Sequence, residues 1–159
     1  MKEVSFFVLI LILVTSCRYV EPEITPVADP ETLEYYFEKF ETEAAVRGII
    51  IDLEEYDLEA RIDEIELPNV AGTCHYSSQY PNRVTIDMDF WNTSSILSRE
   101  MVVFHELGHC VLYRSHREDA WSNGRCVSIM QSGLGSCRLL YNLENRTGYL
   151  DELFFPNNF

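Results

Sequence analysis

Apolar residues in the segment 30–48 follow the helical period. One stripe recurs at intervals of three and four residues, at Leu33, Tyr36, Phe37, Phe40 and Ala44. Asp29 is a typical N-cap residue, Pro30 suits the first helical position, and Gly48 is a typical helix stop. The pattern therefore predicts an amphipathic helix from Pro30 to Gly48.

Later segments have the character of strands. Ile49–Leu53 is a β-branched run, and the acidic stretch Glu54–Glu66 is predicted to be strand and loop. Val70–Tyr76 is a further candidate strand. In Val84–Phe90, apolar residues alternate with Thr and Asp, which predicts a half-buried strand.

Two more helices are predicted in the second half of the chain. The first begins near Ser98, with Glu100 in its first turn and a core stripe at Met101, Phe104, Gly108 and Leu112. Arg114–Leu140 is irregular, and Tyr141–Phe155 returns to a helical pattern. Helices and a few strands in a chain of 159 residues predict one α+β domain, which we take to be a monomer.

The amino end has the pattern of an export signal. Lys2 precedes the apolar run Phe6–Val14, which is too short to span a bilayer. The run ends in Val-Thr-Ser-Cys, which resembles a bacterial lipoprotein box and implies a signal peptide over 1–16 and lipidation of Cys17. A plain secretory signal is the alternative. The proline-rich residues 17–29 predict a lipidated cysteine followed by a tether. Because Arg18 is not the aspartate of inner-membrane retention, the resemblance favours the outer membrane of the cell envelope.

Composition and charge exclude one class of partner. The chain carries 26 acidic against 12 basic residues, a net charge of -14, and its 47% hydrophobic content is enough for a core. Nucleic-acid binding depends on clustered Lys and Arg, so DNA and RNA are excluded. Residues 21–66 hold 16 acidic against three basic residues, whereas residues 67–159 hold nine against seven. Candidate chemistry is therefore sought in the nearly neutral second half.

Four cysteines remain when Cys17 is set aside. Thiols of an exported chain tend to pair, and four of them allow three connectivities. We expect disulfides between Cys74 and Cys110 and between Cys126 and Cys137. Four buried free thiols that act as small hydrophobes are the alternative.

Residues 105–109 read His-Glu-Leu-Gly-His inside a predicted helix. Positions four apart lie one above the other, about 6 Å along the axis, so the imidazoles of His105 and His109 reach one metal ion. Glu106 lies about 100° round the axis from His105, beside the metal and not on it. This is the placement of a general base that deprotonates a metal-bound water.

Catalytic zinc needs a third protein ligand, and its fourth position is left to water. His116 is the first candidate, because it follows the predicted helix end, where the chain folds back towards the metal. Asp119 is a second candidate, since carboxylates also bind zinc. Glu144 or Glu152 would be the ligand in a gluzincin-like arrangement, although neither lies in that family's downstream motif. No cysteine pair has finger-like spacing, so the sequence predicts one catalytic Zn²⁺.

The helix motif, together with His116 and the segment Ser128-Ile129-Met130, resembles the metzincin metalloproteases. It is also similar to small bacterial lipoproteins of the zinc-dependent metalloproteinase type. The resemblance covers about residues 84–130. It implies a zincin-like catalytic domain over 30–159, with His105, His109 and His116 as ligands, Glu106 as general base and acid, and Met130 as the base of the site.

The sequence departs from the metzincin pattern after the helix. The third histidine follows the first by 11 residues and not ten, and Leu112 stands where metzincins have glycine. The turn that brings His116 to the metal must therefore be built differently. Ser132 stands where astacins have a metal-bound tyrosine, so no such ligand is expected.

The resemblance implies a membrane-anchored zinc endopeptidase that hydrolyses peptide or protein substrates. The rival is a non-catalytic lipoprotein that keeps the zincin shape to bind a peptide or protein. An intact Glu106 argues against it, because a pure binder has no need of a general base. By resemblance, Val84–Phe90 forms the upper rim of the cleft and pairs with substrate, unless it is an ordinary sheet strand. Arg114 and Arg117 either recognise a substrate carboxylate or are solvated loop residues.

Overall fold

The computed structural model describes residues 29–76, 82–133 and 140–158. The predicted signal peptide, the lipidated Cys17 and the tether lie outside the described residues, apart from Asp29 at the end of the tether. Among the residues that are described, no helix is both long enough and apolar enough to cross a membrane.

Three short strands form one sheet. β1 (Leu58–Asp63), β2 (Gly72–His75) and β3 (Asn82–Asp87) lie in the order β1-β3-β2. The central strand β3 is parallel to β1 and antiparallel to β2. Val84 and Ile86 of β3 are fully buried, as the alternation of that segment predicted. The strand β2 is therefore an edge strand.

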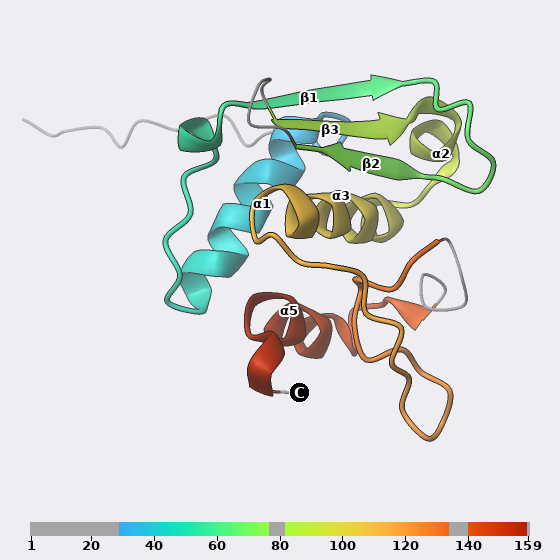
Figure 1. Ribbon diagram of the computed structural model, residues 1–159. Helices are drawn as coiled ribbons and strands as arrows, with labels where there is room; N and C mark the ends of the chain where they lie inside the picture. Colours follow the sequence, from blue (N-terminus) through green and yellow to red (C-terminus); the bar gives the residue numbers. More distant parts are fainter. Residues whose placement is uncertain (1–28, 77–81, 134–139, 159) are drawn as a thin grey trace, which may run out of the picture.

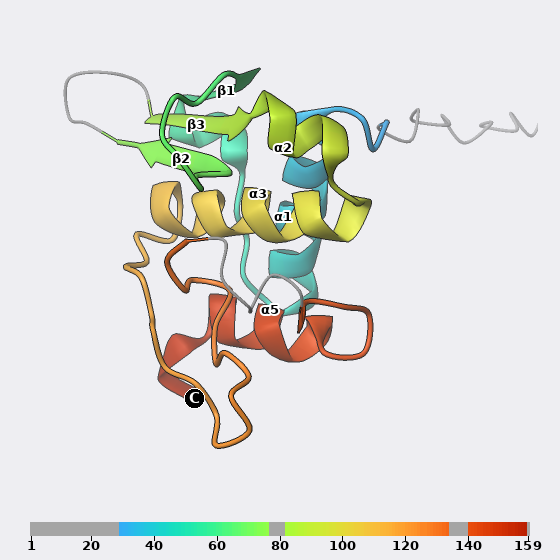
Figure 2. The same ribbon diagram turned by 90° about the vertical axis from the view of Figure 1, so that its right-hand side faces the viewer.

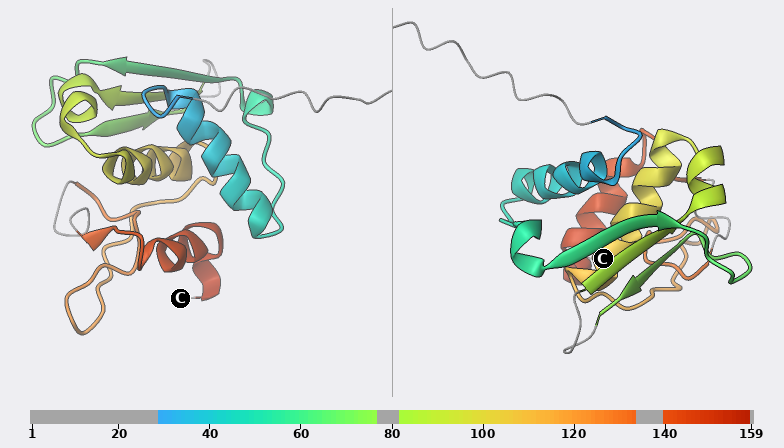
Figure 3. Two further views of the ribbon diagram at one scale, coloured as in Figure 1. Left: turned by 180° about the vertical axis from the view of Figure 1, so that it is seen from behind. Right: turned by 90° about the horizontal axis from the view of Figure 1, so that it is seen from above.

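Three helices pack in layers beneath this sheet. The helix α3 (Ile96–Cys110) lies under the sheet, α1 (Leu33–Val46) packs against α3, and α5 (Arg146–Phe154) lies beyond α3 (Figure 1). A quarter turn shows α3 between the sheet and α5 (Figure 2). Seen from above, the strands cross α3 while α1 lies to one side (Figure 3). The predicted α+β class is confirmed.

Phe40 connects the three helical layers. It is fully buried on α1, and its ring lies 5.2 Å from that of Phe104 on α3 and 5.1 Å from that of Phe154 on α5. Aromatic pairs at this distance add about 0.5–1.5 kcal/mol to the free energy gained by burial. The apolar stripe that predicted α1 is thus the face that packs against the helix carrying the candidate site.

The first helix begins later than the sequence predicted. Asp29 does not cap it, because its side chain accepts a hydrogen bond from Glu31 N–H and its carbonyl accepts one from Thr32 N–H, which makes a turn before Leu33. The carboxyl end of α1 is as predicted. Gly48 has a φ of +78°, and the N–H groups of Gly48 and Ile49 donate to the last carbonyls of the helix.

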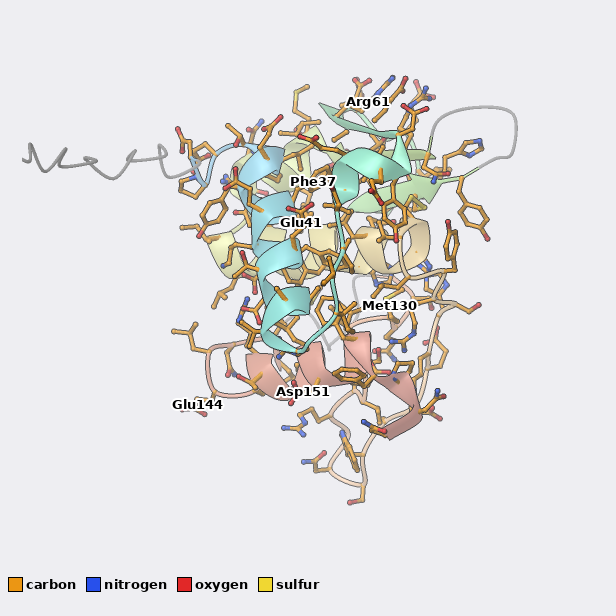
Figure 4. All side chains as sticks on the ribbon, turned by 90° about the vertical axis from the view of Figure 1, so that its left-hand side faces the viewer. Phe37, Glu41, Arg61, Met130, Glu144 and Asp151 are labelled. Atoms are coloured by element: carbon orange, nitrogen blue, oxygen red, sulfur yellow. A yellow bond between two sulfur atoms is a disulfide. The ribbon has the colours of Figure 1, made fainter. Side chains whose placement is uncertain are left out.

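The strand prediction for Ile49–Leu53 is wrong. The chain is irregular up to Asp52 and then forms the 3-10 helix η1 (Leu53–Tyr56). The Asp52 carboxylate accepts from Glu54 N–H, and Leu53 N–H donates to the side chain of Glu41 on α1 (Figure 4). These side chains therefore bind the N–H groups of Leu53 and Glu54, which begin the 3-10 helix.

Side-chain caps also decide where the next elements begin. The predicted strand Val84–Phe90 stops at Asp87, whose carboxylate accepts from Phe90 N–H at 2.8 Å and starts α2 (Met88–Thr93). The helix α3 is capped by Ser95, whose hydroxyl accepts from Ser98 N–H, so Ser98 is not the cap. The chain closes with the 3-10 helix η2 (Pro156–Asn158).

Glu100, which the sequence placed in the first turn of a helix, is not exposed to solvent. It is fully buried, and its carboxylate accepts from Arg146 Nε at 2.5 Å and Tyr141 OH at 2.6 Å and pairs with Lys39. Burial alone would raise the pKa of Glu100, but the hydrogen bonds from Arg146, Lys39 and Tyr141 outweigh it and lower the pKa. The network ties α3 to α1 and to the start of α5.

This lowered pKa predicts a loss of stability in acid. A carboxylate with a depressed folded-state pKa stabilises the fold above its unfolded pKa, and the contribution is lost as the pH falls through the folded pKa. Replacing Glu100 with Gln removes the counter-charge of Lys39 and one of the two counter-charges of Arg146, which also pairs with Glu43. Breaking such a buried pair costs about 3–5 kcal/mol. We expect Glu100→Gln to lower the thermal midpoint at pH 7 and to flatten its dependence on pH below about pH 4.5. Equal acid sensitivity in both proteins would contradict this.

Candidate metal centre

Three histidine side chains converge at the carboxyl end of α3. His105 and His109 lie one turn apart on the helix, and His116 comes from the loop that follows. The Nε2 atom of His109 lies 3.1 Å from that of His105 and 3.1 Å from that of His116. One nitrogen from each ring lies within 4.8 Å of the other two, so the group is able to hold a metal ion.

Backbone carbonyls fix the tautomers of the two helical histidines. Nδ1 of His105 lies 2.7 Å from the oxygen of Ile129, and Nδ1 of His109 lies 2.6 Å from that of Arg114. Because a carbonyl only accepts, each Nδ1 carries a proton and each Nε2 presents a lone pair. Burial lowers the pKa of His105 to about 4 and also lowers that of His109. Both rings are therefore neutral near pH 7, as metal ligands must be.

The short contact between the two Nε2 atoms is not a hydrogen bond. Neither His105 nor His109 has a proton on Nε2, so two lone pairs face each other at 3.1 Å. Such an approach is repulsive unless a cation lies between the two atoms. Nitrogen ligands of one tetrahedral zinc ion, each at about 2.05 Å, are separated by about 3.3 Å. The two separations of 3.1 Å are therefore compatible with a tetrahedral metal ion such as zinc.

Glu106 is buried between α3 and the edge strand β2. It is 6% exposed, and the backbone N–H of Cys74 donates to its carboxylate. Burial raises the pKa of Glu106 to about 8, and the hydrogen bond from Cys74 opposes that rise only in part. Glu106 faces the cavity beside the histidines but does not belong to the ligand group.

Gly72 makes room for Glu106. A Cβ atom at Gly72 would lie 2.9 Å from both Cγ and Oε1 of Glu106, closer than carbon and oxygen atoms pack without a bond. Gly72 was not among the site residues predicted from the sequence. A glycine inside a candidate strand, a sign of close approach by another chain segment, was the signal that could have identified it.

A disulfide joins Cys74 of β2 to Cys110, the last residue of α3. The two Cα atoms are 5.7 Å apart, and the pairing confirms one of the two predicted disulfides. A cross-link over 36 residues stabilises the fold by about 4 kcal/mol and holds the N–H of Cys74 near Glu106. The other predicted pair, Cys126 with Cys137, stays a prediction because Cys137 lies outside the described residues.

Met130 fills the space beneath the ligand helix. It is fully buried and lies between α3 and α5 (Figure 4). A Cβ atom at Gly108 would lie 2.5 Å from the Met130 sulfur, so only glycine allows this contact. The residue before it, Ile129, supplies the carbonyl that orients His105. Met130 thus packs against the helix that carries His105 and His109, and its role as the base of a metal site stays a prediction.

The turn after α3 is built without glycine. Tyr113 has a φ of +52°, in the left-handed region that glycine usually occupies. Arg114 N–H then donates to the carbonyl of Gly108 at 2.9 Å, which fixes the returning chain. The chain thus turns back towards the helix two residues before His116.

A cavity of about 380 Å³ opens beside the histidines. The edge strand β2 contributes Gly72, Thr73 and Cys74 to its wall. The expectation that Val84–Phe90 forms the upper rim is wrong, because β3 is the central strand and both of its edges are paired. The strand available at the cavity is β2.

The other candidate ligands lie apart from the histidines. Asp119 accepts from Arg117 Nε at 2.9 Å, Glu144 is exposed in the turn before α5 (Figure 4), and Glu152 is buried against Arg114 and Arg117. None belongs to the group that could hold a metal. The two arginines are therefore neither solvated nor available to a substrate carboxylate, which corrects both interpretations of them.

Comparison with known proteins finds no matching family model, curated protein or solved structure. The function is therefore inferred from the geometry of the site.

Proposed function

We propose that the protein is a zinc-dependent endopeptidase with a zincin-like, metzincin-like domain. The observation that carries the proposal is the placement of Glu106. Its buried carboxylate faces the same cavity as the unprotonated Nε2 atoms of His105 and His109, without being one of the ligands. A general base beside an open metal site is the requirement for hydrolysis.

His105, His109 and His116 would hold the metal. When bound, zinc lowers the pKa of a water and polarises a carbonyl. His116 is exposed, and only three protein ligands are grouped among the described residues, which is the pattern of a catalytic site and not of a closed structural one.

Glu106 would move the proton. Beside a bound cation Glu106 would be ionised in spite of its burial. Its carboxylate would then take a proton from the attacking water and pass it to the leaving amine. The Cys74 N–H holds the carboxylate in place, and burial keeps competing water away from it.

The substrate would bind along β2. The open side of an edge strand can pair with an extended peptide as a further strand. The N–H of Cys74 is already bound to Glu106, so the peptide would pair with the other backbone groups of that side. A peptide bound in this way would lie beside Glu106, over the cavity that β2 lines. We also propose that the lipid at Cys17 anchors the domain to the bacterial outer membrane.

The test is zinc content together with cleavage of an unfolded protein substrate. We expect the freshly purified protein to contain about one zinc ion and to cleave the substrate until a chelator is added. Absence of zinc, with no cleavage after zinc is supplied, would contradict the enzyme and favour the non-catalytic peptide binder.

Metal removal should also lower stability. A ligand that binds only the folded state at 100 times its Kd stabilises it by about 2.7 kcal/mol. We expect a chelator to lower the thermal midpoint of the unsubstituted protein by several degrees. A His109→Ala variant should have the lower midpoint at the outset and respond little to chelator. An unsubstituted protein whose midpoint ignores both chelator and added zinc would contradict the site.

A further inference from the structure

Glu152 is a buried carboxylate that the proposed mechanism does not use. It lies on α5 and is fully buried. Its Oε1 atom accepts from Arg114 Nη2 at 2.7 Å and from Arg117 Nη1 at 2.9 Å, while Oε2 has no hydrogen-bond partner among the described residues. A buried carboxylate costs several kcal/mol unless it is paired, and the two arginines offset that cost.

Arg114 connects this carboxylate to the second histidine. Its guanidinium also donates to the carbonyls of Leu153 at 2.6 Å and Glu152 at 3.0 Å, at the carboxyl end of α5. Its backbone carbonyl accepts the Nδ1 proton of His109 at 2.6 Å. A guanidinium held by three acceptors thus fixes the position of the backbone atom that orients His109.

Arg117 fixes the other side of the same loop. Its backbone N–H donates to the carbonyl of Met130, and its guanidinium bridges Glu152 and Asp119. His116 lies between the two arginines, in a segment without helix or strand and with an exposed side chain. Its position in space therefore depends on the anchoring of its neighbours.

We infer that Glu152 is a positioning residue for the metal centre. Acting through Arg114 and Arg117, it holds the loop that carries His116 and the carbonyl that orients His109. The inference depends on the proposed role of the three histidines as metal ligands. Outer-shell partners of metal ligands typically contribute 10–100-fold in metal affinity. We expect a loss of this size when the carboxylate is removed.

The experiment compares Glu152→Gln with Glu100→Gln in the full chain. Zinc affinity is measured by competition with a chelator, and the absorption spectrum of the Co²⁺-substituted protein reports ligand geometry. Both glutamates are fully buried and bind cationic side chains, but Glu100 contacts Lys39, Tyr141 and Arg146 and not the ligand loop. We expect both variants to lose stability, but only Glu152→Gln to bind zinc about 10–100-fold more weakly with an altered spectrum.

A second variant keeps the test decisive if Glu152→Gln fails to fold. Arg117→Lys leaves the buried carboxylate paired with Arg114, while it removes the guanidinium that bridges Glu152 and Asp119. It should also weaken zinc binding. If the folded variants bind zinc as tightly as the unsubstituted protein does, the inference is overturned and the proposed function stays intact. Absence of zinc binding by the unsubstituted chain would overturn both.

Discussion

Replacing Glu106 with Gln is expected to abolish hydrolysis while zinc stays bound. General acid–base catalysis contributes about 10²–10⁴-fold in rate, and an amide cannot take up the proton. Gln has nearly the same shape, so β2 and α3 should keep their packing around Gly72. It also carries no charge for burial to penalise, so the thermal midpoint should be equal or higher.

The measurement is kcat/KM on an unfolded protein substrate, together with zinc content and thermal midpoint. Glu144→Gln is the matched control, because it makes the same chemical change on an exposed residue away from the cavity. It should behave like the unsubstituted protein. Undiminished hydrolysis by Glu106→Gln would exclude Glu106 as the base, and loss of zinc would show that it acts as a ligand.

Strongly periodic segments of the fold could be predicted from the sequence. The apolar stripe through Phe40 was sufficient to predict α1, and the alternation around Ile86 was sufficient to predict β3. These side chains are fully buried, and their spacing indicates which face of the element is buried. Apart from the end of α1 at Gly48, the boundaries of these elements could not be predicted. They depend on which of several polar side chains caps a free backbone group, and the structure uses Ser95 and not Ser98, and Asp87 as a cap in what was expected to be a strand.

The same division holds for the candidate site. Spacing alone places His105, Glu106 and His109, because a helix fixes their relative positions. The partners of these residues come from segments distant in sequence, such as the carbonyl of Ile129 and the N–H of Cys74. Glu152 was considered as a ligand because its charge is visible in the sequence, whereas its two arginine partners become visible only when α5 packs against the loop. Backbone groups and buried ion pairs have no spacing rule that the sequence alone reveals.

Gly72→Ala is expected to lower kcat about 100-fold without a change in zinc affinity. The new Cβ would lie 2.9 Å from Cγ and Oε1 of Glu106 and 3.0 Å from Val102, so either the carboxylate or β2 must move. The disulfide between Cys74 and Cys110 limits the movement of the strand, so we expect the carboxylate to be displaced. A misplacement of about 1 Å can cost about 10²-fold in rate. The three histidines do not contact Gly72 in this way, and the overpacking should cost about 1–3 kcal/mol of stability.

Gly148→Ala is the matched control, because a Cβ there meets nothing within 4 Å and lies within α5. It should keep full activity and gain up to about 1 kcal/mol of stability. The combination of Gly72→Ala with Glu106→Ala identifies the cause, since truncation at Cβ removes both the Cγ and the Oε1 atoms that the added methyl group would meet. If the overpacking arises from contact with Glu106, Gly72→Ala should cost less stability in the Glu106→Ala background than in the unsubstituted protein. An equal cost in the two backgrounds would show that Gly72 acts on the strand and not on the carboxylate.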